Sequence, residues 1–121
     1  MARAFSLAGA DVMIASRSLD SCRATADAIS AESGRAVKVH ACHVGRWNEV
    51  DELAEVAWNE LGGVDVLVNN AGKSPLYESV AAIDEKLWDS VIGLNLKGPF
   101  RLSALLGTRM AERARTTGVT G

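Results

Sequence analysis

The clearest periodic pattern in the chain lies in residues 47–61. Apolar side chains recur there at i, i+3, i+4, i+7 and i+11, which places them on one face of a helix. They are Val50, Leu53, Ala54, Ala57 and Leu61, and Gly62-Gly63 follow as a stop signal. The pattern predicts an amphipathic helix over 47–61 whose apolar face covers a core.

Three short apolar segments predict strands, at about 11–16, 36–42 and 64–69. The third runs from Val64 to Val68 and is apolar on both faces apart from Asp65. Strands of this kind belong in the middle of a parallel sheet that is covered by helices. The sequence therefore predicts a layered α/β molecule.

Helices are predicted on either side of these strands. Their expected ranges are 2–8, 19–33, 47–61, 84–94 and 99–113. In the helix over 19–33, Ser18 and Asp20 are capping candidates, and Gly34 ends it. Its inward residues are expected to be Ala24, Ala28 and Ile29, with Cys22 as a further candidate. The alternation of strands and helices is that of a doubly wound parallel sheet, and the tail over 114–121 is expected to fray.

Composition narrows the classes of partner. The 121 residues include 13 basic and 15 acidic side chains, for a net charge of −2, and no run of like charge. This balance disfavours a nucleic-acid or polybasic membrane surface and favours small molecules or other proteins as partners. No apolar run approaches the length of a membrane span, so a cytoplasmic location is expected. Cys22 and Cys42 make no Cys-x-x-Cys pair, and neither a disulfide nor a metal site is expected.

The turn Asn69-Asn70-Ala71-Gly72 follows the predicted strand over 64–68. Ligands of parallel α/β sheets bind at the carboxyl ends of the strands, which is where this turn lies. Asparagine amides can lock such a loop by bonding to nearby backbone, and Ala71 and Gly72 leave room for a flat group to approach. The turn is therefore a candidate binding element.

Three further segments complete a set of four with this turn. They are Ala15-Ser16-Arg17, Cys42-His43-Val44 and the stretch from Gly93 to Phe100 around Asn95. In this order, the four resemble the short-chain dehydrogenase/reductase family. The resemblance implies a single partial NAD(P)-binding, Rossmann-like domain over 1–121. It also implies hydride transfer between a nicotinamide cofactor and a small-molecule alcohol or carbonyl substrate.

The resemblance places the cofactor against named residues. NAD-preferring members of the family usually carry an acidic residue at the position of Ser16, and here Arg17 offers a planar cation suited to a 2′-phosphate. NADP(H) is therefore favoured over NAD(H), against the alternative of a solvated surface arginine. Val44 fits as a wall for the adenine. His43 replaces the family's usual aspartate and is interpreted as bonding to backbone or water.

The same resemblance assigns the other end of the cofactor. Asn70 is expected to contact it, with Ala71 and Gly72 contributing backbone. Asn95 matches the family's catalytic asparagine, whose backbone carbonyl holds a water in the proton relay behind a lysine. Without the other matches, an asparagine beside glycines would be an ordinary helix break.

Other family features do not occur in the sequence. The family's reaction uses a tyrosine with a lysine four residues later and a serine, but the only tyrosine is Tyr77, and Ala81 lies four residues after it. The glycine-rich diphosphate loop is absent as well. The chain is therefore expected not to be catalytically competent as given. The alternative is a non-catalytic cofactor-binding remnant or an interaction scaffold.

Two consequences concern assembly. In the family's sheet, another strand separates those predicted at 11–16 and 64–68, so these two either pair directly or leave apolar edges open. The last helix carries apolar residues over more than one face, and the family pairs this helix in dimers. A homo-oligomer is therefore expected for the full-length protein.

Overall fold

The sheet consists of two parallel strands, β1 (Val12–Ser16) and β2 (Val37–Ala41). The computed structural model describes residues 1–118, and within them Val12 lies opposite Val37 and Ser16 opposite Ala41. Both strands therefore end at the same edge of the sheet, where the loops after Ser16 and Ala41 lie next to each other.

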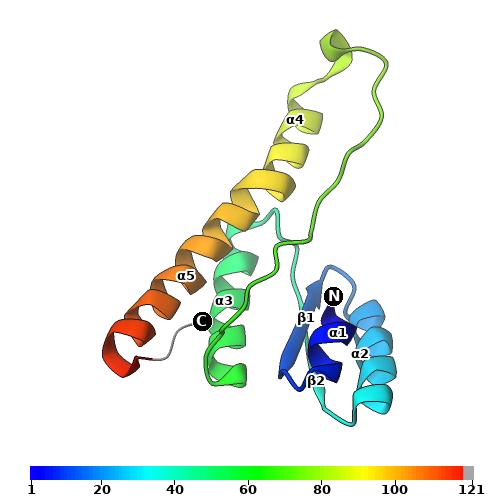
Figure 1. The fold of residues 1–121 in the computed structure, drawn as a ribbon. Coiled ribbons are helices and arrows are strands. Elements are labelled where there is room, and N and C mark those ends of the chain that lie inside the picture. The colour runs from blue at the N-terminus through cyan, green and yellow to red at the C-terminus, as the bar shows by residue number, and fades with distance from the viewer. Residues whose placement is uncertain (119–121) are drawn as a thin grey trace.

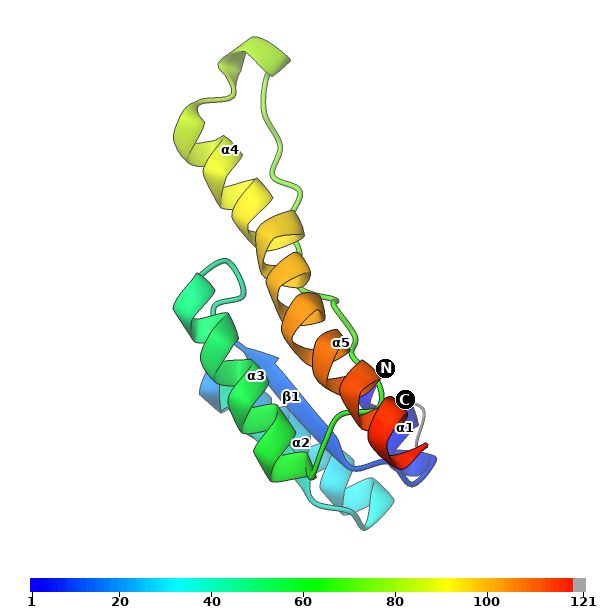
Figure 2. The same cartoon turned by 90° about the vertical axis from the view of Figure 1, so that its left-hand side faces the viewer.

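Helices cover both faces of this sheet (Figure 1). On one face, α1 (Ala2–Leu7) packs against α2 (Leu19–Ser33), which contacts both strands. On the other, α3 (Trp47–Leu61) contacts β1 and lies alongside α5 (Gly98–Thr117), as the rotated view in Figure 2 also shows. The molecule has the expected α/β layering.

The main core lies between α3, α5 and the sheet. It contains the four buried residues predicted on α3, whereas Leu61 is only half-buried. The buried members of this cluster are Cys42, Val50, Leu53, Ala54, Ala57, Val64, Leu102 and Leu106. The periodic pattern on α3 therefore identified most of the helix face that packs in the core.

The ends of α2 match their sequence signals, and its buried face matches at Cys22 and Ile29 but not at the alanines. The Ser18 side chain accepts a hydrogen bond from the Ser21 N–H at 3.2 Å, and Gly34 ends the helix with φ of 71°. The buried residues are Cys22, Ala26 and Ile29, whereas Ala24 and Ala28 are exposed. The prediction for these two alanines was wrong because each lies two positions from Ala26, about 200° around the helix.

The third predicted strand is not formed. Residues 64–69 have no ladder pairing, and the side chains of Val66 and Val68 are 60% and 45% exposed. A strand needs a neighbour for its N–H and C=O groups, and within residues 1–118 β1 pairs only with β2. Of the two alternatives expected from the sequence, the structure therefore has open edges rather than direct pairing.

Residues 73–92 form an arm that leaves the body of the molecule (Figure 1). It comprises a loop, a short 3₁₀ turn (Val80–Ala82) and α4 (Glu85–Ile92), which has no buried residue. A π-helical turn (Gly93–Lys97) then joins α4 to α5, so the three segments form one long rod. The predicted helix junction is thus a π turn rather than a break.

Helix α5 continues four residues beyond its predicted end. The Thr117 hydroxyl donates to the Arg113 carbonyl at 2.8 Å, and the Gly118 N–H donates to the Ala114 carbonyl with φ of 72° at Gly118. Residues 114–117, which the sequence assigned to a frayed tail, are helical in the structure because side-chain and capping bonds complete the last turn. Residues 119–121 lie outside the described residues. Within residues 1–118, no helix is long and apolar enough to cross a membrane.

Candidate functional site

The end of β1 forms an open hollow lined by Ser16, Arg17, Ser18 and Ser21. The Ser16 hydroxyl bonds within this turn: it donates to the Ser18 carbonyl at 3.2 Å and accepts from the Ser18 N–H at 3.3 Å. The N-terminus of α2 opens into the same hollow, and its unpaired N–H groups favour an anion.

Arg17 is exposed at the rim of this hollow. Most arginines of the chain are paired with a carboxylate, whereas among residues 1–118 Arg17 and Arg115 have no such ion pair. The Arg17 guanidinium is therefore available to an anionic ligand. A planar guanidinium can donate two parallel hydrogen bonds to a phosphate.

His43 and Val44 follow β2 and lie next to the end of β1, because the Cys42 N–H donates to the Ser16 carbonyl at 2.9 Å. The His43 Nδ1 accepts from the Gly45 N–H at 3.1 Å. This agrees with the interpretation of His43 as a histidine that bonds to backbone. The His43 N–H donates to the Glu49 carboxylate at 2.6 Å. This bond, and then the Arg46 guanidinium, lower the pKa of Glu49.

The loop Asn70-Ala71-Gly72 is exposed and is held by the Asn95 side chain. The Lys73 N–H donates to Asn95 Oδ1 at 2.9 Å, and Asn95 Nδ2 donates to the Lys73 carbonyl at 2.8 Å. A Cβ added at Gly72 would lie 3.4 Å from Asn95 Oδ1. The structure therefore brings the Asn95 side chain to the end of the loop Asn70-Ala71-Gly72, a contact that the sequence did not predict.

Asn95 lies in the π turn, four residues before Pro99. Proline has no N–H, so the ordinary α-helical bond from residue 99 to the Asn95 carbonyl cannot form.

Two serines that bond to this region, Ser103 and Ser90, were not predicted from the sequence. The Asn69 side chain donates to the Ser103 hydroxyl of α5 at 2.9 Å, and the Lys73 ammonium donates to the Ser90 hydroxyl of α4. Ser103 sits among leucines on α5, and that isolated hydroxyl was the signal available in the sequence. The loop is thus attached to three successive helical segments.

The glycines of the π turn connect the two halves of the site. A Cβ added at Gly98 would lie 2.7 Å from Val44 Cγ1 and 2.8 Å from the Val44 carbonyl carbon, so Gly98 packs directly on Val44. Gly93 lies in ordinary contact with Gly45, since a Cβ added at Gly93 would be 3.7 Å from the Gly45 carbonyl oxygen. The loop after β2 and the turn that carries Asn95 are therefore in backbone contact.

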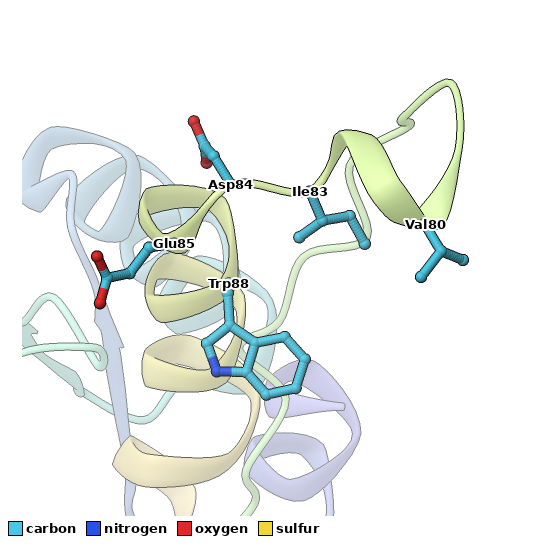
Figure 3. A pocket seen from close by; sticks show the side chains of 5 residues that line it. All are labelled: Val80, Ile83, Asp84, Glu85 and Trp88. Carbon is cyan, nitrogen blue, oxygen red and sulfur yellow. The ribbon is translucent and has the colours of Figure 1, made fainter.

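A second hollow lies on the arm and contains none of the predicted site residues. It is lined by Val80, Ile83, Asp84, Glu85 and Trp88, and both carboxylates point away from the indole (Figure 3). Over residues 1–118, no group of three or more His, Cys, Asp or Glu side chains is arranged to hold a metal ion. Burial raises the pKa of the Cys42 thiol to about 11, which keeps it protonated. The polar groups that could bind a ligand thus gather at the edge formed by the ends of β1 and β2 and the loop 70–73.

A parallel sheet with helices on both faces and polar loops at the strand ends is the architecture of Rossmann-type nucleotide-binding proteins. Comparison with known proteins specifies the class further. Residues 1–119 match the family model described as short chain dehydrogenase, and the chain belongs to that family.

Curated relatives agree with this assignment. Dehydrogenase/reductase SDR family member 4 from Oryctolagus cuniculus is 31% identical over 113 residues, which are 93% of this chain and 43% of the relative. The human mitochondrial dehydrogenase/reductase SDR family member 2 is 34% identical over 93% of this chain and 40% of its own length. The chain therefore spans about two fifths of the length of these relatives.

Solved structures show the same fold. A putative short-chain alcohol dehydrogenase from Sinorhizobium meliloti superposes with a TM-score of 0.85 at 33% identity, over 92% of this chain and 43% of that one. A metagenomic short-chain oxidoreductase in complex with NADP superposes with a TM-score of 0.87 at 30% identity, over 92% of this chain and 50% of that one.

Proposed function

We propose that this chain forms the cofactor side of an oxidoreductase that interconverts an alcohol and a carbonyl by hydride transfer, with NADP(H) preferred to NAD(H). The observation that carries the proposal is the unpaired Arg17 at the hollow formed by Ser16 and the start of α2. A carboxylate at the position of Ser16 would repel a 2′-phosphate, and the serine does not. The complexes of family members with NADP and NADPH support this choice of cofactor.

In this proposal, the adenosine end of the cofactor lies at Ser16, Arg17, His43 and Val44, and the nicotinamide ribose lies at Asn70, Ala71 and Gly72. The bound nicotinamide supplies or accepts the hydride. The Asn95 side chain fixes the loop through Lys73. In this proposal, the Asn95 backbone carbonyl would hold a water of the proton relay. These residues orient the cofactor and do not themselves form or break bonds to the substrate.

The chain as given carries no tyrosine–lysine pair for proton transfer. Tyr77 is 53% exposed on the loop of the arm, and Ala81 lies four residues later. We therefore propose that residues 1–121 alone do not catalyse the reaction. The same observation favours a second candidate function, a non-catalytic nucleotide-binding or scaffold protein.

The test titrates the chain with adenosine 2′,5′-bisphosphate and with ADP while backbone amides are followed by NMR. Shifts at Ser16 to Ser18 and at Val44 are expected, with about tenfold tighter binding of the 2′-phosphate compound because a charged pair to phosphate is worth roughly 1.5–3 kcal/mol. Arg17→Ala should abolish the preference. Arg115→Ala, which also removes an unpaired arginine, should retain it.

Equal affinity for both nucleotides, or an unchanged preference in Arg17→Ala, would contradict the NADP(H) assignment. Absence of any shift at the β1 and β2 ends would favour the scaffold function over the cofactor site. NADPH itself is expected to bind only weakly, since the diphosphate loop is not in the sequence.

A further inference from the structure

The tightest backbone approach in the site region is at Gly98, the first residue of α5. Gly98 is buried, and a Cβ at this position would overlap both the Val44 side chain and the Val44 carbonyl group. The nearest obstacles are therefore backbone atoms, which cannot rotate away as the end of a flexible side chain can. Any side chain at residue 98 requires either the loop after β2 or the helix to move.

The loop after β2 is firmly held. The Arg46 N–H donates to the His43 carbonyl at 2.8 Å, and the His43 N–H donates to Glu49 at 2.6 Å. Cys42, at the start of the loop, is fully buried and bonded to Ser16 of β1. Moving Val44 would break these bonds, so the loop resists displacement.

Helix α5 is fixed on the other side of Gly98. Arg101 makes two hydrogen bonds to Asp51 of α3, at 2.6 and 3.1 Å, and its guanidinium stacks over Trp47 at 4.6 Å. Leu102 is buried in the core. The segment that can yield is the π turn Gly93–Lys97, which contacts the exposed α4 and has no buried residue.

We infer that Gly98 is a positioning residue that keeps the π turn seated on Val44, so that Asn95 reaches the loop 70–73. A displacement of the π turn moves Asn95 away from Lys73 and releases the loop. The functional consequence rests on the proposed function, because that loop is the proposed wall for the nicotinamide ribose. The geometry also links this wall to Val44, the proposed wall for the adenine.

The test measures hydrogen exchange of the Lys73 amide in Gly98→Ala. About tenfold faster exchange than in the unaltered chain is expected, because the two bonds between Lys73 and Asn95 are lost. Gly107→Ala is the matched control: it lies in the same helix, and a Cβ there would meet nothing within 4 Å. In this control, the Lys73 amide should exchange at the unaltered rate.

A merely structural role would accelerate exchange throughout the molecule, so amides of α2 are followed alongside Lys73. Asn95→Ala removes the bonds directly, and the double variant with Gly98→Ala should exchange Lys73 no faster than Asn95→Ala alone. Equal acceleration in α2, or additive effects in the double variant, would overturn the inference.

If Gly98→Ala does not fold, Gly45→Ala is measured instead. Its Cβ would lie 3.0 Å from the His43 imidazole and 3.6 Å from the Gly93 carbonyl carbon, so it tightens the neighbouring contact between the loop after β2 and the π turn only slightly. A smaller but selective acceleration at Lys73 supports the inference, and an unchanged rate contradicts it. Neither readout involves a nucleotide, so failure here is distinguishable from failure of the proposed function.

Discussion

Arg113 holds the segment that the sequence predicted as a strand. Its Nη2 donates to the Val64 carbonyl at 3.1 Å and to Asp65 at 2.5 Å, and the guanidinium lies over Trp58. Its buried Nε has no hydrogen-bond partner among residues 1–118, and this unsatisfied donor offsets part of the stabilisation that the other bonds of Arg113 provide. One side chain on α5 thus replaces some of the contacts that a neighbouring strand would make.

Replacing Arg113 with methionine keeps the apolar stem and removes these bonds. We expect the free energy of unfolding to fall by about 1–2 kcal/mol, since hydrogen bonds to a charged group are lost while one partner is exposed. Urea denaturation measures this change. Arg115→Met, which alters the same helix without an ion pair, should stay within about 0.5 kcal/mol of the unaltered chain.

Glu49 gives the stability a defined dependence on pH. Its pKa in the folded chain is below the usual 4.5 because it accepts from the His43 N–H and from Arg46. The stabilisation that ionised Glu49 gives the folded chain is therefore fully present above the pKa that Glu49 has in the unfolded chain. It is lost as the pH falls through the lower pKa that Glu49 has in the folded chain. Unfolding should become easier below about pH 4.5.

Glu49→Gln should flatten part of this acid dependence in denaturation curves recorded between neutral and acidic pH. The rest of the acid dependence should persist, because Arg101 and Arg3 lower the pKa values of Asp51 and Glu32 in the folded chain as well. Glu78→Gln on the exposed loop is the control. An unchanged slope in Glu49→Gln would show that the bond to the His43 N–H contributes nothing to stability.

At the scale of elements, local signals were sufficient where the partners are local. Ser18, Gly34 and Gly62 set the ends of α2 and α3, because a cap needs only the adjacent turn. The prediction of a strand over 64–69 was wrong because a strand depends on a neighbouring strand, which can lie far away in sequence. The π turn was not predicted because one extra residue does not change the apolar pattern around Asn95 in a recognisable way.

For the candidate site, the sequence supplied a set of residues but not the contacts between them. Asn70, Gly72 and Asn95 were placed by resemblance, and the structure brings Asn95 to the end of that loop through Lys73. The role of Gly98 could not be seen in the sequence, since its reason is the backbone of Val44, 54 residues earlier in the numbering. Contacts of this kind are visible only in three dimensions.

Helix α4 depends on its N-cap more than the other helices do. The Asp84 carboxylate accepts from the Leu87 N–H at 2.7 Å, and no residue of α4 is buried. Asp84→Ala should destabilise this helix by about 1 kcal/mol. We expect faster hydrogen exchange in Glu85–Ile92 with little change in the urea midpoint. A large loss of global stability would show instead that α4 is coupled to the core.

At the scale of the whole molecule, the body and the arm differ in how they are held. The body has a core between two helices and a two-stranded sheet, whereas the arm exposes Leu76, Tyr77, Val80 and Trp88. One edge of β1 and the segment 64–69 remain without ladder partners within residues 1–118. Open strand edges are templates for pairing with another chain.

We therefore expect concentration-dependent association of this chain. Sedimentation velocity over a range of concentrations measures it, and Val66→Lys with Val68→Lys should reduce it, since charge on an open strand opposes pairing. Leu76→Lys on the arm is the matched control and should leave association unchanged. A monomer with a sharp cooperative urea transition would contradict this expectation.

The π turn absorbs one residue without redirecting the arm. A π turn holds one residue more than an α-helical turn because its hydrogen bonds close i→i+5 rings, as the Gly98 N–H does with the Gly93 carbonyl. Deleting Leu94 should therefore let α4 and α5 merge into an uninterrupted α-helix that keeps nearly the same course. A further residue inserted outside the wide turn has no such outlet, and it would rotate the arm by about 100° around the common axis.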